Sequence, residues 1–314
     1  MPTPSTPTVT WPDGRRFAFT VFDDTDNMTL DVGSIVYGFL AEIGMLTTKT
    51  VWPIESAEPP QIGGTSCADP DYRSWVLDLQ EQGFEIGLHG VAAGTADREQ
   101  TVAGLDRFHQ IFGHDPHTHA NHSGCDNCIY WGEKRLTGAA RLAYNVMTRF
   151  RNRGWQGEVE GSPLFWGDVC RSRIEYVRNF VYGDINTLAA CPDMPYHDPR
   201  RPYVREWFAS SEGSAVDAFV DMISEDNQDR LEQEGGACIM YTHFASGFVV
   251  DGQLDPRFRH LMTRLAAKDG WFVPTTTLLD HIRTQRGGQH VISDRRRRAL
   301  ERRWLRHKMS VGAS

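Results

Sequence analysis

Short apolar runs alternate along this chain with longer amphipathic segments, and this alternation restricts the fold more than any other feature. Between the runs, apolar residues recur at helical spacing. Strands separated by helices of this length predict βαβ units and a mostly parallel sheet with right-handed crossovers, and enough such units close an α/β barrel. The runs that we interpret as strands are 17–22, 46–52, 84–89, 237–242 and 271–274.

The chain has 314 residues, which is enough for one large α/β barrel or two ordinary domains. We expect one barrel domain over 15–284, with an irregular insert around 125–205 that is rich in aromatic residues and Pro. Residues 1–14 are expected to form a loose N-terminal tail. Residues 285–314 are expected to form a basic, helical C-terminal tail.

Charge is distributed unevenly along the chain. Lys and Arg number 33 and Asp and Glu number 41, which gives a net charge of −8. The segment 295–308 is strongly basic, so the remainder is more acidic than the total suggests and is a poor nucleic-acid binder. The basic segment could contact phosphate or an anionic membrane, or dock on the acidic body through Trp304 and Leu305. No apolar run approaches the roughly 20 residues of a membrane span.

Cysteine usage bears on the compartment. Six cysteines are too few for a disulfide scaffold of this size, and the first ten residues lack the basic and apolar parts of a signal peptide. We therefore expect reduced thiols and a cytoplasmic protein, which could form a homo-oligomer.

Acids and imidazoles follow the predicted strands. Asp23, Asp24 and Asp26 come after the first strand, His89 ends the third, and His243 follows 237–242. Reactive groups in parallel α/β folds lie just past the carboxyl ends of the strands. Carboxylate and imidazole are ligands of zinc, iron, cobalt and nickel. The pattern predicts a metal site at this end of the barrel.

The three neighbouring carboxylates repel one another unless a cation or hydrogen-bond donors compensate them. A helix beginning near Asn27 offers free N–H groups, and we expect Asp26 to cap it. Asp23 and Asp24 are then left for chemistry.

A histidine-rich segment lies between Gly113 and Gly124. We expect one of its histidines to join the site formed by the acids. The spacing His119-x2-His122-x2-Cys125-x2-Cys128 also allows a separate structural zinc site. That alternative is less favoured, because usual zinc modules pair their ligands across a longer loop.

Three segments together resemble the polysaccharide deacetylase family, also known as NodB homology or carbohydrate esterase family four. Thr20–Asp24 is similar to its Thr-Phe-Asp-Asp motif with one residue inserted, and Gly83–His89 is a close match to its Gly-x-Glu-Ile-Gly-x-His segment. Met240-Tyr241-Thr242-His243 fits its late Leu-x-His motif in type. The resemblance, to a divergent member, implies a distorted (β/α) barrel and metal-dependent hydrolysis of an amide, an N-acetyl group on a sugar or polysaccharide precursor.

The resemblance also implies roles for individual residues. Asp23 would be the catalytic base and His243 the general acid on the leaving nitrogen, while Asp24 and His89 would bind one divalent metal ion. Zinc is the favoured ion, with iron, cobalt or nickel as alternatives.

One departure from the family concerns the third ligand. The family's second metal-binding histidine lies four residues after the first, and this position is Ala93 here. We expect His122 to replace it, with His119 as the alternate. Ala93 also keeps open a metal-independent amidohydrolase that acts on a small cyclic amide. A sugar-binding barrel without catalysis is the remaining alternative.

Substrate contacts are expected from the histidine-rich segment and from the irregular insert. Asn121 could donate a hydrogen bond to a developing oxyanion, and the aromatic rings of Trp131, Trp166 and Tyr203 could stack on a sugar face. Buried packing is the alternative for each ring.

Overall fold

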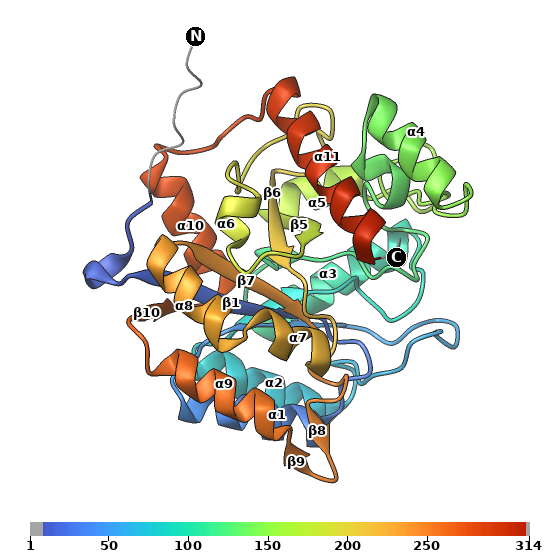
Figure 1. Cartoon of the computed structure of the whole chain (residues 1–314). Coiled ribbons are helices and arrows are strands. Elements are labelled where there is room, and N and C mark those ends of the chain that lie inside the picture. The colour runs from blue at the N-terminus through green and yellow to red at the C-terminus, as the bar shows by residue number, and fades with distance from the viewer. Residues whose placement is uncertain (1–8, 312–314) are drawn as a thin grey trace.

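The computed structural model describes residues 9–311 and contains a parallel sheet that closes on itself (Figure 1). The sheet order is β10-β1-β2-β3-β4-β5-β6-β7, and β1 also pairs with β7, so β1 to β7 form a ring. The strands are β1 (Phe17–Asp23), β2 (Thr48–Val51), β3 (Glu85–Leu88), β4 (Thr118–His119), β5 (Tyr176–Tyr182), β6 (Glu206–Ser211), β7 (Ala237–Thr242) and β10 (Gly270–Phe272). The predicted α/β barrel is therefore confirmed.

Helices connect the strands and cover the outside of the ring (Figure 1). The connecting helices are α1 (Leu30–Glu42), α2 (Pro70–Glu81), α3 (Arg98–Phe112), α4 (Gly138–Met147), α5 (Gly167–Arg173), α6 (Thr187–Ala190), α7 (Val216–Met222), α8 (Glu225–Glu234), α9 (Pro256–Ala266) and α10 (Thr275–Gln285). Helix α11 (Asp294–Val311) follows the last of them. Two 3₁₀ turns, η1 (Pro12–Gly14) and η2 (Gly132–Arg135), and a small hairpin, β8 (Val249–Val250) with β9 (Gln253–Leu254), complete the fold.

Strand β1 is the centre of the core, and all seven of its residues are buried. It pairs with β2, β7 and β10, so each edge is covered, and a strand buried on both faces reads as an almost continuous apolar run. This is why β1 could be predicted from the sequence with accurate ends.

Strands β5 and β6 were not predicted, and β5 lies inside the segment expected to be an irregular insert. Part of 125–205 is therefore barrel wall. These strands do not read as continuous apolar runs, because they carry buried polar groups, including Arg178 and Asn179 on β5 and Glu206 on β6. Such residues break an apolar run, and only partners elsewhere in the fold make their burial tolerable.

Residues 9–14 do not form part of the loose N-terminal tail expected over 1–14. Residues 1–8 lie outside the described residues, but the next residues pack on the barrel. Trp11 is buried, its ring centroid lies 6.2 Å from that of Trp271, and its Nε1 donates to the carbonyl of Gly235 at 3.0 Å. The packed body therefore includes Val9 and Trp11.

Helix α11 lies across the barrel near α4 (Figure 1). The Trp304 side chain is fully buried, with ring centroids 5.4 Å from Phe180 of β5 and 5.5 Å from Tyr144 of α4. The buried carboxylate of Glu301 accepts hydrogen bonds from Thr137. This Arg-rich segment is thus a helix with one face packed on the barrel. No helix in residues 9–311 is long and apolar enough to cross a membrane.

Candidate active site

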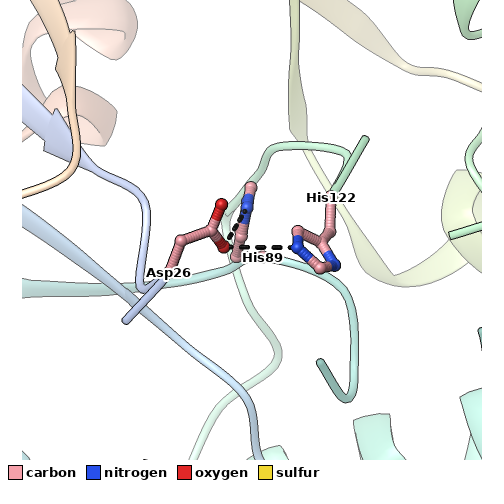
Figure 2. A group of neighbouring side chains, drawn as sticks. All are labelled: Asp26, His89 and His122. Atoms are coloured by element: carbon pink, nitrogen blue, oxygen red, sulfur yellow. Dashed lines mark ion pairs between the residues drawn. The ribbon is translucent and has the colours of Figure 1, made fainter. Parts of the chain in front are cut away.

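Asp26, His89 and His122 converge at one end of the barrel (Figure 2). Asp26 Oδ1 lies 3.2 Å from His89 Nε2 and 3.4 Å from His122 Nε2. The three residues stand on the segments that follow β1, β3 and β4. Because parallel strands end at the same side of a barrel, residues distant in sequence meet there.

The donor set fits a divalent metal ion. Asp26 Oδ1 and His122 Nε2 are buried and have no hydrogen-bond partner, although they point at a common position. Buried polar atoms are normally paired, so orphaned atoms need an explanation. Burial and the nearby His89 lower the pKa of His122 to about 4, so its ring is neutral and able to ligate at pH 7.

Asp26 supplies the carboxylate of this cluster. Burial alone would raise its pKa, but the charge of His89 and the hydrogen bond from His243 hold the pKa well below its ordinary range. The expectation that Asp26 caps a helix is wrong. Helix α1 begins three residues later than expected, and Thr29 caps it by accepting a hydrogen bond from the N–H of Val32.

Asp24 lies beside the cluster and is held by an arginine. Arg178 donates to both of its carboxylate oxygens, at 3.0 and 2.5 Å. Asp24 Oδ1 also lies 3.6 Å from His89 Nδ1, the ring nitrogen opposite the cluster. At this distance the two atoms are close but not hydrogen-bonded, and His89 Nδ1 is buried without a hydrogen-bond partner. The structure thus places Asp26, rather than Asp24, with the two histidines.

Asp23 faces away from the cluster. Its carboxylate accepts hydrogen bonds from the Tyr37 hydroxyl at 2.9 Å and from the Phe244 N–H at 2.9 Å, and it lies 3.3 Å from Lys49 Nζ. Tyr37 belongs to α1, so Asp23 points into the layer between barrel and helix. Burial raises the pKa of Asp23 despite the opposing charge of Lys49. The side chain also does not line the cavity that lies beside Asp26 and His89.

That cavity has a volume of about 210 Å³, and two residues of the cluster, Asp26 and His89, border it. Asp24, Asp26, His89 and His243 all line it. His243 accordingly lies where the sequence placed it, at the end of β7.

His243 is positioned by contacts at both ring nitrogens, including one of 3.4 Å between Nε2 and the Tyr241 hydroxyl. Nδ1 lies 2.8 Å from the carbonyl of Ser214, and Nε2 lies 3.3 Å from Asp26 Oδ2. Burial opposes the charged ring, but the hydrogen bond and charge of Asp26 and the charge of Asp24 raise the pKa of His243 to about 9. The imidazolium therefore carries a proton at neutral pH and can donate it into the cavity.

His119, the alternate third ligand, is not part of the cluster. Its Nδ1 lies 3.3 Å from the carbonyl of Leu88, and burial lowers its pKa to about 3. The separate zinc site of His119, His122, Cys125 and Cys128 is not formed either. Within residues 9–311, Asp26, His89 and His122 are the group whose donor atoms lie close enough to share an ion.

The expected substrate contacts divide into two groups. Trp131 and Asn121 line the cavity, although Asn121 already exchanges two hydrogen bonds with the backbone of Ile129, at 2.8 and 3.0 Å. Trp166 and Tyr203 are not among the lining residues. Trp166 is buried behind the site and donates to the carbonyl of Asn127 at 2.7 Å, whereas Tyr203 stacks near Tyr130. For these two rings, packing is the observed role.

Several lining residues were not found from the sequence. Arg178 and Tyr241 stand on β5 and β7, and Arg135 and Trp304 come from η2 and α11. Only strand alternation could have signalled part of this, because consecutive residues at a strand end point to opposite faces. That rule predicts that Asp23 and Asp24 point to opposite faces of the strand. It does not predict which of the two faces the cavity.

No protein family model and no curated protein matches the chain. Solved structures match most of it at low identity. "Puue Allantoinase" has 13% identity and a TM-score of 0.49 over 89% of this chain and 95% of that chain. A probable polysaccharide deacetylase from Pseudomonas aeruginosa PAO1 has 13% identity and a TM-score of 0.46 over 86% and 92%.

A third match is the catalytic domain of peptidoglycan N-acetylglucosamine deacetylase from Eubacterium rectale ATCC 33656. Its identity is 14% and its TM-score is 0.39, over 88% of this chain and 95% of that chain. All of these values are too low to transfer a substrate or an activity to this protein.

Proposed function

We propose that this protein is a metal-dependent hydrolase that cleaves a carbon–nitrogen amide bond. The observation that carries the proposal is the cluster of Asp26, His89 and His122. Asp26 Oδ1 and His122 Nε2 are buried without hydrogen-bond partners, and Asp26 and His89 line a cavity with Asp24 and His243. Two nitrogen donors and one oxygen donor suit zinc, with iron, cobalt or nickel as alternatives. A cation bound there supplies Lewis-acid chemistry for acyl transfer.

Asp24 is our candidate for the general base. It lines the cavity, whereas Asp23 does not, and this location replaces the role that the family resemblance implies for Asp23. Two hydrogen bonds from Arg178 hold the Asp24 carboxylate in place at the wall of the cavity. A carboxylate held there can accept the proton of an attacking water molecule.

His243 is our candidate for the general acid. Its carbonyl contact through Nδ1 leaves Nε2 directed at Asp26 and the cavity. The ring holds a proton at neutral pH and can deliver it to the departing nitrogen. Asp24 and His243 line one cavity, as an acid–base pair requires.

The substrate is proposed to be an N-acetylated sugar or another small amide. Support comes from the sequence motifs around Asp24, His89 and His243 and from the cavity, whose small volume favours compact substrates. We keep the sugar as the first class to screen, and small cyclic amides as the second.

The test combines metal content with amide hydrolysis. Purified protein is analysed by inductively coupled plasma mass spectrometry and then screened for acetate or amine release from N-acetylated sugars and cyclic amides. We expect about one metal ion per chain, loss of activity with a chelator and recovery with zinc. Asp24→Asn should keep the ion and lose at least about 100-fold in kcat.

Two outcomes would reject this function. Hydrolysis that continues after complete removal of the ion would support the metal-independent amidohydrolase. A protein that holds the ion and binds N-acetylated sugars, but hydrolyses no amide, would support the sugar-binding barrel.

A further inference from the structure

Arg135 is a buried arginine in the wall of the cavity, opposite in charge to the acids of the site. It closes η2, and only 4% of its surface is exposed. Its guanidinium carbon lies 4.0 Å from the ring centroid of Trp131 and 4.4 Å from that of Trp304. The guanidinium therefore makes cation–π contacts with two indole rings.

No carboxylate pairs with Arg135 in the part of the chain that the structure describes. The other buried arginines are matched: Arg178 binds Asp24, and Arg201 and Arg297 bind Asp198. Glu212 also lines the cavity but is not within ion-pair distance of Arg135. The Tyr144 side chain interacts with Arg135, yet Arg135 Nε remains buried without a hydrogen-bond partner.

An unpaired buried cation is costly, so its presence beside a cavity indicates a ligand that completes it. The planar guanidinium matches a carboxylate, which accepts two parallel N–H bonds from it. Arg135 lines the same 210 Å³ space as Asp26 and His89 of the metal-ligand cluster. A single small molecule can therefore reach both.

Helix α11 limits how large this molecule can be. Trp304 and Lys308 of α11 line the cavity, so the C-terminal helix covers one side of the site. Pockets for drug-sized ligands hold about 300 to 1,000 Å³, and this cavity is smaller. The enclosure favours a compact substrate over a long polymer.

We propose that the substrate is a small amide bearing a carboxylate group, which Arg135 binds through its in-plane N–H groups. This inference rests on the hydrolase function proposed above and adds to it the charge class of the substrate. A phosphate group shares the anionic chemistry, and the experiment separates the two.

The experiment measures binding rather than turnover. Isothermal titration calorimetry compares N-acetylglycine with N-acetylglycinamide, which has nearly the same shape and lacks the charge. The protein is used as purified, at pH 7.5, and inorganic phosphate is titrated in parallel. We expect N-acetylglycine to bind at least about tenfold more tightly than either other ligand, as one charged hydrogen-bonded pair provides.

Variants assign the preference to Arg135. Arg135→Gln should abolish the preference for N-acetylglycine over the amide. Arg135→Lys should retain only part of it, because lysine keeps the charge but cannot donate two parallel hydrogen bonds to one carboxylate. Arg302→Gln, which removes an exposed arginine of α11, is the matched control and should bind as wild type does. Thermal unfolding checks that each variant is folded.

Several results would overturn the inference. These are equal affinities for acid and amide in the wild type, no binding of any of the three ligands, tighter binding of phosphate, or an undiminished preference in Arg135→Gln. If Arg135→Gln does not fold, the wild-type comparison and Arg135→Lys still decide. Hydrolysis of neutral amides without any anion preference would leave the proposed function intact and reject this inference alone. A preference for N-acetylglycine over the amide without hydrolysis of any amide would support anion binding by Arg135 and reject the proposed hydrolase function.

Discussion

Arg178 and Asp24 form a buried, two-pronged ion pair across the interior of the barrel, with N–O distances of 3.0 and 2.5 Å. Arg178 lies on β5 and Asp24 directly follows β1, and these strands are not neighbours in the ring. The pair therefore connects opposite walls. It holds Asp24 at the mouth of the cavity, while Asp23, one residue earlier, turns outward toward α1.

The first prediction concerns the third metal ligand. His122→Ala and Asp26→Ala should each lower metal affinity at least about 100-fold, because each removes one of three protein ligands. Metal content after dialysis, measured by mass spectrometry, tests this. His119→Ala is the matched control, because His119 is equally buried but bonds to a backbone carbonyl. Retention of the ion in His122→Ala, or its loss in His119→Ala alone, would reject the assignment.

The second prediction separates a structural from a chemical role for Asp23. Asp23→Asn should lower the free energy of unfolding by about 3–5 kcal/mol, because it leaves the Lys49 ammonium buried without its charge partner. Urea denaturation measures the loss, and the metal content should not change.

The double variant Asp23→Asn with Lys49→Met is the control for that interpretation. It removes both charges, so part of the lost stability should return. A single variant as stable as the wild type would show that the pair contributes nothing to folding.

The third prediction concerns the C-terminal helix. Trp304→Ala should cost about 3–5 kcal/mol, because the indole is fully buried between Phe180 and Tyr144 and its removal leaves a cavity. Arg302→Ala on the same helix is exposed and should change the unfolding free energy by less than about 0.5 kcal/mol. Equal effects of the two variants in urea denaturation would contradict the docking of α11.

The fourth prediction concerns the pH dependence of stability. Burial raises the pKa of Glu206 from 4.5 to about 7, against the opposing charge of Arg283. The folded state thus binds this proton more tightly than the unfolded state, so stability falls as pH rises from about 4.5 through 7. At pH 8 the full cost is about 3 kcal/mol, from about 1.4 kcal/mol per pKa unit.

Glu206→Gln should remove this contribution. The variant should be more stable than the wild type at pH 8 and similar to it at pH 4.5, as measured by urea denaturation across the range. Glu81→Gln, on the exposed face of α2, should keep the wild-type slope. A wild-type profile unchanged by Glu206→Gln would refute the prediction.

The sequence by itself determined the strands that read as apolar runs and the helices between them. Strands β1 and β7 were predicted almost to the residue, because a strand buried on both faces leaves an unbroken apolar run. It also placed His89 and His243 at strand ends, because all parallel strands of a barrel end on one side. His122 was chosen over His119 for the cluster, and the structure brings it there.

Only the tertiary structure determined where each of the three acids points, because Asp23, Asp24 and Asp26 carry the same side chain. Their partners come from Lys49, Arg178 and His89, which are 26 to 154 residues away in the chain, and no local pattern encodes these contacts. The same holds for β5, whose buried Arg178 is acceptable only because Asp24 lies opposite. Local periodicity specifies the elements of this protein, whereas the pairing of buried charges across the barrel specifies its site.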